Sequence, residues 1–112
     1  MIKRFKDEDQ SWLDAYQKAL DEQYPGLVQE IIVFGSKARG DDRQYSDFDV
    51  FMVICEGDWR LKWELEGLAC ELSIGTNTIP TVMIFTEHEK KEMEEKQSSF
   101  YENVLDEGIK VS

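Results

Sequence analysis

A pair of small residues directly after an apolar, β-branched run constrains this chain more than any other feature. Residues 30–34 have the composition of a buried strand, and Gly35 and Ser36 follow at once. We therefore expect these two residues where a strand ends and a helix begins. Glycine lets a phosphate approach the backbone, while the free N–H groups of a helix start and the serine hydroxyl supply donors. The sequence predicts an anion-binding turn at this point.

Two carboxylates introduce the next apolar run. Asp47 and Asp49 stand at the start of a strand predicted over residues 50–54, and side chains two apart on a strand share a face. Neighbouring acids repel each other, and a divalent cation between them removes that repulsion. Each motif alone is common in turns and helix caps, but their succession across a short polar link favours a site for a metal-bound nucleotide. Mg²⁺, which prefers oxygen ligands, is the expected cofactor.

The motifs occur in the order Gly35-Ser36, Ala38-Arg39-Gly40 and Ser46-Asp47-Phe48-Asp49. This order resembles the signature of the minimal nucleotidyltransferases of the DNA-polymerase-β-like superfamily. Residues 100–109 resemble the C-terminal segment of the same family. The resemblance implies an α/β (α+β) nucleotidyltransferase fold, in which a small mixed sheet of about three to four strands packs with helices.

The resemblance also implies roles for individual residues. Gly35, Ser36 and Arg39 would bind the nucleotide, and Asp47 and Asp49 would be the catalytic ligands of the metal.

Active members of the family usually carry a third carboxylate on a later strand. In this chain that strand is predicted over residues 79–85, which contain no acid, and Thr81 is nearest the expected position. A hydroxyl can bind a metal through water, but it cannot act as a base near neutral pH. Glu71, Asp42 or a residue of a partner could replace the missing acid, and the sequence leaves these alternatives open.

Two functions of different class follow. In the first, the protein transfers a nucleoside monophosphate, most readily AMP from ATP, to a hydroxyl. The resemblance implies that the acceptor could be a tyrosine of a helical toxin, for which this chain would be the antitoxin. In the second, the chain binds a nucleotide or a partner without turnover, because the third acid is missing.

Size and charge restrict the partners. A chain of 112 residues is expected to form one domain, residues 1–112. A net charge of −11 argues against binding long nucleic acids. No apolar stretch approaches the roughly 20 residues that span a bilayer, and the N-terminus is too acidic for a signal peptide. We expect a cytoplasmic protein without membrane association, able to pair with itself or with a helical toxin.

The remaining pattern predicts the other elements. The expected order is helix, strand, helical turn, strand, helix, strand, helix, helix, with capping boxes at Thr86-x-x-Glu89 and Ser99-x-x-Glu102. A charged helix over residues 87–96 is interpreted as a solvated face, with docking of a basic partner as the alternative. Helical spacing and turn composition also predict where several side chains lie. We expect Trp12, Trp59, Trp63, Cys55 and Cys70 in the core, His88 at the surface, and Arg43 and Tyr45 in a turn or over the nucleotide.

Overall fold

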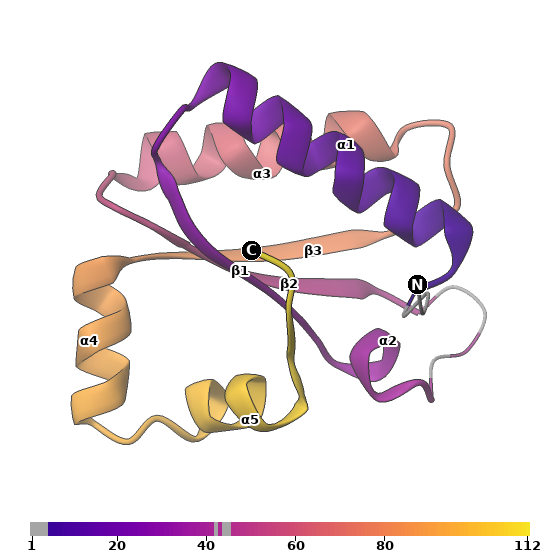
Figure 1. Ribbon diagram of the computed structural model, residues 1–112. Helices are drawn as coiled ribbons and strands as arrows, with labels where there is room; N and C mark the ends of the chain where they lie inside the picture. The colour runs from indigo at the N-terminus through magenta and orange to yellow at the C-terminus, as the bar shows by residue number, and fades with distance from the viewer. Residues whose placement is uncertain (1–4, 42, 44–45) are drawn as a thin grey trace.

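The computed structural model describes residues 5–41, 43 and 46–112. In chain order the elements are α1 (Asp7–Gln23), β1 (Val28–Phe34), α2 (Ser36–Arg39), β2 (Phe48–Ile54), α3 (Trp59–Ser73), β3 (Pro80–Thr86), α4 (Glu87–Glu95), α5 (Ser99–Glu107) and β4 (Ile109–Lys110). Figure 1 shows a sheet with α1 and α3 on one face and α4 and α5 towards the other. Among the described residues, every helix is too short or too polar to span a bilayer.

The sheet is mixed, as predicted. Its four strands lie in the order β3-β2-β1-β4, with β1 antiparallel to β2 and β4, and β2 parallel to β3. Two parallel neighbours in a sheet need a long crossover connection, usually a helix. Between β2 and β3 this connection contains α3. The fold class predicted from the sequence is confirmed.

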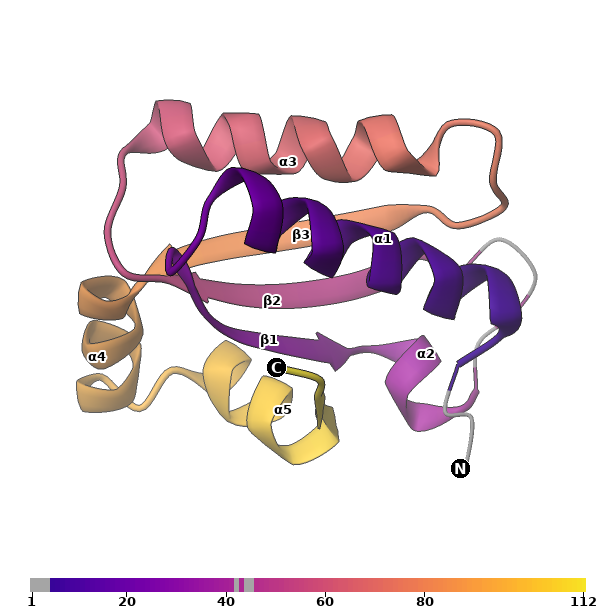
Figure 2. The same ribbon diagram turned by 45° about the horizontal axis from the view of Figure 1, so that its top comes forward.

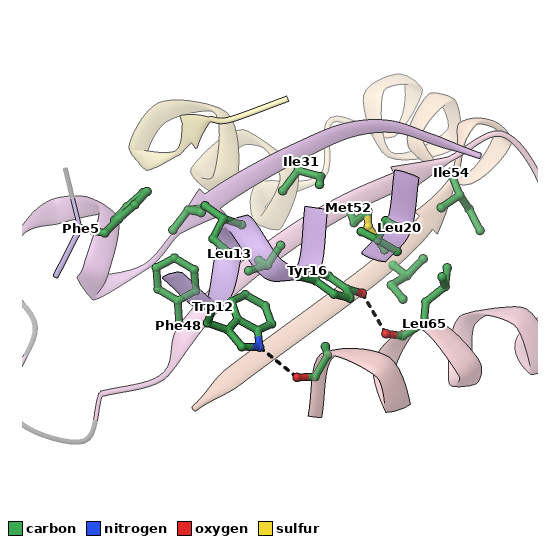
Figure 3. Packing of buried hydrophobic residues seen from close by; sticks show 14 residues of the cluster. Phe5, Trp12, Leu13, Tyr16, Leu20, Ile31, Phe48, Met52, Ile54 and Leu65 are labelled. Carbon is green, nitrogen blue, oxygen red and sulfur yellow. Dashed lines mark hydrogen bonds between the residues drawn. The ribbon is translucent and has the colours of Figure 1, made fainter. Parts of the chain in front are cut away.

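The main core lies between the sheet and the layer of α1 and α3. Buried residues recur along α1 with helical spacing, so that Trp12, Leu13 and Tyr16 face the sheet. Trp12 Nε1 donates to the carbonyl of Ala69 at 3.0 Å, and Tyr16 Oη donates to that of Leu65 at 2.9 Å (Figure 3). These bonds satisfy the polar tips of two buried rings and fix α1 against α3.

A second, smaller core lies on the opposite face. Phe51 and Val53 of β2 pack there against Tyr101 and Val104 of α5. Because successive strand residues alternate between faces, the odd-numbered positions of β2, including Asp49, belong to this side. Figure 2 shows α4 and α5 together on this side of the sheet.

Three predictions about buried side chains are corrected. Trp59 and Trp63 are 69% and 71% exposed, and Cys70 is exposed as well. The leucines of α3 already fill the side that faces α1 and the sheet, which leaves these residues on the outer side. Periodicity alone does not tell which of two apolar stripes faces inwards. Cys55 is partly buried, and its thiol donates to the carbonyl of Gly26 at 3.3 Å.

The caps agree with the sequence except at one helix. Thr86 and Glu89 form the predicted capping box of α4. The cap of α5 is Ser98, whose hydroxyl accepts from Tyr101 N, so the predicted box at Ser99 is wrong by one residue. His88 is exposed, as expected, and contacts Glu92 at 2.8 Å.

Candidate functional site

The turn after β1 has the expected form. Gly35 takes φ 77° and ψ −158°, a conformation open only to glycine at low cost, and α2 starts at the next residue. The N–H groups of Ala38 and Arg39 both donate to the Gly35 carbonyl at 3.1 Å. The Ser36 N–H lies at the first position of α2, where a helix offers no acceptor carbonyl one turn earlier. Backbone donors and the Ser36 hydroxyl therefore gather at the end of β1.

The Asp49 carboxylate lies directly against this turn. Phe34 pairs with Asp49 across β1 and β2, which brings the acid beside the residue that follows Phe34. A Cβ on Gly35 would overlap Asp49 Oδ2 and would stand 3.2 Å from Cγ. Only glycine leaves the space for this carboxylate. The structure thus joins the predicted anion turn to one of the two predicted metal ligands.

The charge of Asp47 acts on the half-buried carboxylate of Asp49. β2 begins at Phe48, between the two aspartates, so Asp47 stands exposed just before the strand and Asp49 is half-buried within it. Burial raises the pKa of Asp49 above its usual value, and the Asp47 charge raises it further, while Arg39 lowers it. The unfavourable pairing of two carboxylates is the kind that a bound cation relieves.

Arg39 already has carboxylate partners in this structure. Its Nε donates to Asp41 Oδ2 at 3.2 Å, and its Nη1 donates to Glu107 Oε2 at 2.9 Å. The guanidinium therefore connects the α2 turn to the end of α5. It keeps further N–H donors, since a guanidinium has five. Arg39 lies at the rim of the site. Its role in nucleotide binding stays a prediction.

Thr81 lies beside Asp49 in the sheet. The parallel register pairs these residues across β2 and β3, so their side chains leave the sheet on the same face. Among the residues that the structure describes, no three side chains of His, Cys, Asp or Glu are grouped to hold a metal ion. Glu71, one of the proposed replacements for the third acid, therefore does not join the aspartate pair. Asp42, the other, lies outside the described residues.

A buried ion pair behind the turn was not predicted. Lys37 Nζ of α2 contacts Asp9 Oδ2 at 2.9 Å, and both side chains are at most one-tenth exposed. Asp9 also accepts from the Thr78 hydroxyl at 2.7 Å. The contacts tie the first turn of α1 and the segment before β3 to the anion turn. The sequence pointed to this ion pair only through an acid in the first turn of α1. Acids are usual at a helix N-terminus, so this one identifies no partner.

The link between the turn and the acids is described in part. Two hydrogen bonds join Arg43 and Ser46: Arg43 N donates to Ser46 Oγ at 2.7 Å, and Ser46 N donates to the Arg43 carbonyl at 3.0 Å. This agrees with the turn that the sequence favoured for Arg43. Tyr45, the other residue considered for contact with the nucleotide, lies outside the described residues.

Comparison with known proteins adds two findings on sequence. A family model described as a nucleotidyltransferase domain matches residues 13–111. The protein named "Putative protein adenylyltransferase MJ0604" of Methanocaldococcus jannaschii is 33% identical over 95 residues, which amount to 83% of this chain and 87% of that protein.

Solved structures with a similar fold include two toxin–antitoxin proteins. A mutant of the toxin–antitoxin MntA–HpeT matches with a TM-score of 0.57 and 21% identity, over 89% of this chain and 71% of that chain. A toxin–antitoxin crystallised with AMP-PNP matches with a TM-score of 0.57 and 20% identity, over 94% of this chain and 72% of that chain. At such identities the likeness concerns the fold.

Proposed function

The chain belongs to the nucleotidyltransferase domain family, as its motifs predicted, and on this basis we propose that it binds ATP with Mg²⁺ and transfers AMP to a hydroxyl group. The observation that carries the proposal is the contact between Gly35 and Asp49. It brings a carboxylate against backbone donors suited to phosphate, and a triphosphate needs both a cation and donors.

The donor set fits a divalent metal ion. Asp47 and Asp49 offer carboxylate oxygens, the ligands that Mg²⁺ prefers. Burial and the neighbouring Asp47 charge raise the pKa of Asp49, and a bound cation would favour its ionised form. When bound, the ion would neutralise phosphate charge and polarise the α-phosphate. Gly35, Ser36 and the start of α2 would hold the phosphate oxygens, and Arg39 would add positive charge at the rim.

The reaction would form one bond and break another at the α-phosphorus. The acceptor oxygen attacks, the bond to the β-phosphate oxygen breaks, and pyrophosphate leaves with the electron pair. The acceptor proton would pass to water, because Thr81, which pairs with Asp49, is the residue that we propose in place of a carboxylate base, and its hydroxyl cannot take a proton near neutral pH. This chain is therefore expected to transfer AMP slowly.

A tyrosine of a helical toxin is the acceptor that we propose. The solved structures of similar fold include toxin–antitoxin proteins, one of them with AMP-PNP, which supports a protein partner and a triphosphate ligand. The net charge of −11 disfavours a nucleic acid as acceptor. A protein hydroxyl presented by a separate chain would also suit a module of this size.

Labelling with ATP tests the transfer. The purified chain, MgCl2 and α-labelled ATP are incubated with a protein that co-purifies with it, and intact mass is measured. We expect the partner to gain the mass of one AMP, and Asp49→Asn to abolish the gain. Leu105→Ala, an exposed change on α5, serves as the control with full labelling. Labelling that persists in the Asp49 variant would remove that residue from the site.

A second candidate function is nucleotide binding without turnover. Thr81 beside Asp49 and the lack of a three-ligand group among the described residues favour it. In that case MgATP raises the melting temperature by linkage, but no acceptor is labelled and ATP stays intact. Measuring melting temperature and ATP consumption on one sample separates the two functions.

A further inference from the structure

The outer side of α3 carries an apolar stripe that the core does not use. Its helical members follow one another at the spacing of successive turns, and the C-cap residue comes next in line: Trp59, Trp63, Gly67, Cys70 and the cap Ile74. Trp59, Trp63 and Ile74 are 69%, 71% and 80% exposed. We call these five residues the outer stripe. Figure 2 shows α3 as an outermost element, with α1 and the sheet on its inner side.

The opposite side of the same helix already packs against the main core. Leu65 and Ala69 are buried, and Leu61, Leu68 and Leu72 pack against the main core. A helix with one apolar stripe would suffice for this fold. A helix that is apolar on two opposite sides is usually covered on both, and exposed tryptophans at adjacent turns are typical of contact surfaces.

Acidic side chains border the outer stripe. Glu64, Glu66 and Glu71 are exposed and stand three or four residues from members of the stripe, so they lie along its edges. Glu64 also accepts from the Tyr24 hydroxyl at 3.4 Å and keeps its charge there. The helix has two basic residues: Lys62 is held by Glu89, and the Arg60 guanidinium lies 5.3 Å from the centroid of the Trp59 ring. The border is therefore predominantly negative.

We propose that the outer stripe docks an amphipathic helix of a partner protein whose apolar side is flanked by lysine or arginine. The tryptophans would insert into the apolar side, and the flanking cations would face Glu64, Glu66 and Glu71. A second copy of this chain fits less well, because each chain carries −11 and two such borders would bring acids against acids.

Docking on this side leaves the candidate nucleotide site free. Asp49 is on the face of the sheet that carries α5, whereas α3 covers the other face. The partner would thus be held by one side of the sheet while the nucleotide binds on the other. The inference does not depend on catalysis and goes beyond the proposed function.

Synthetic helical peptides test the chemistry of the partner. One labelled peptide carries leucine at i, i+3, i+4 and i+7 with lysine on both flanks; a second has the same leucines with glutamate flanks. We expect anisotropy to report binding of the lysine peptide alone, weakened by salt. Trp63→Ala should weaken binding about 30-fold or more, whereas Leu105→Ala, which truncates a residue 52% exposed on α5, should not change it.

Several results would overturn the proposal. They are equal binding of both peptides, no binding of the lysine peptide, or unchanged binding by a Trp59→Ala/Trp63→Ala variant that keeps its melting temperature. A concentration-dependent dimer in sedimentation that the double variant abolishes would instead assign the stripe to a second copy. The melting shift with MgATP should persist in the double variant, so failure of docking and failure of nucleotide binding are distinguishable.

Discussion

The carboxylate of Asp49 packs against the α-carbon of Gly35, at the point where β1 passes into α2. Alanine at position 35 would meet both the carboxylate and an unfavourable backbone conformation with φ 77°. We expect Gly35→Ala to lower the free energy of unfolding by about 3 kcal/mol and to remove the stabilisation by MgATP. Gly75→Ala is the matched control: φ is 82° there, but no atom lies within 4 Å of the added methyl group. That variant should lose only about 1 kcal/mol and keep its response to MgATP. Equal losses in both variants would mean that the contact with Asp49 has no energetic consequence.

Restoring an acid beside Asp49 should strengthen metal binding. Thr81→Asp would place a third carboxylate on the same face of the sheet. Without a divalent cation we expect a lower melting temperature than in the wild type, because another negative charge joins Asp47 and Asp49. With MgCl2 and ATP we expect a larger melting shift and faster transfer of AMP. Thr81→Asn, which adds no charge, is the control. A Thr81→Asp variant with no gain in Mg²⁺ response over Thr81→Asn would contradict the assignment of this position.

Asp9 should stabilise both the fold and the anion turn. Asp9→Ala removes the carboxylate that faces the buried ammonium of Lys37 and accepts from Thr78. Removing one partner of such a buried pair costs about 3 kcal/mol or more, and chemical denaturation measures it. Asp14→Ala is the control, because Asp14 is exposed and accepts a bond from Gln10 on the same helix. A loss no larger than that of the control would show that the ion pair does not anchor α2.

The ion pair between Lys62 and Glu89 predicts a dependence on pH. The hydrogen bond from Lys62 lowers the pKa of Glu89 below its usual value of 4.5, and the bond from Thr86 N acts in the same direction. A lowered pKa means that the stabilisation is complete above the unfolded value and is lost as pH falls through the folded value. Glu89→Gln should therefore destabilise at pH 7 by less than about 1 kcal/mol, since the pair is partly exposed, and should match the wild type near pH 2. A difference that stays constant down to pH 2 would assign the effect to the cap and not to the charge.

The sequence predicts those helices and strands whose apolar residues repeat over several turns or strand positions. Residues of α1 and β2 repeat with the spacing of a helix and of a buried strand, and Asp58 and Thr86 mark the caps that the structure contains. β4 was missed, because two residues are too few to show a period and the strand exists only through its pairing with β1. The neighbouring serines at α5 are equivalent in sequence, and the register of the helix decides that Ser98 is the cap.

The order of the motifs along the chain predicts which residues form the candidate site, but not which of them contact one another. Gly35 and Asp49 meet because β1 and β2 are antiparallel in one particular register, which the strand lengths and the link suggest but do not fix. The pairing of Asp49 with Thr81 depends on a parallel crossover through α3, and the contact between Lys37 and Asp9 joins segments that are distant in sequence. Such tertiary contacts leave no periodic signal.

The most direct test of the site uses Mn²⁺ as a paramagnetic substitute for Mg²⁺, since both prefer octahedral oxygen ligands. The full chain is titrated with Mn²⁺ and ATP, and the broadening of backbone amide signals is followed by NMR. We predict that the amides of residues 35–39 and 47–49 and of Thr81 broaden first, and that Asp49→Asn abolishes this. Broadening centred on the acidic helix α4, or broadening at the turn that is unchanged in Asp49→Asn, would contradict the assignment of the metal and the nucleotide to this site.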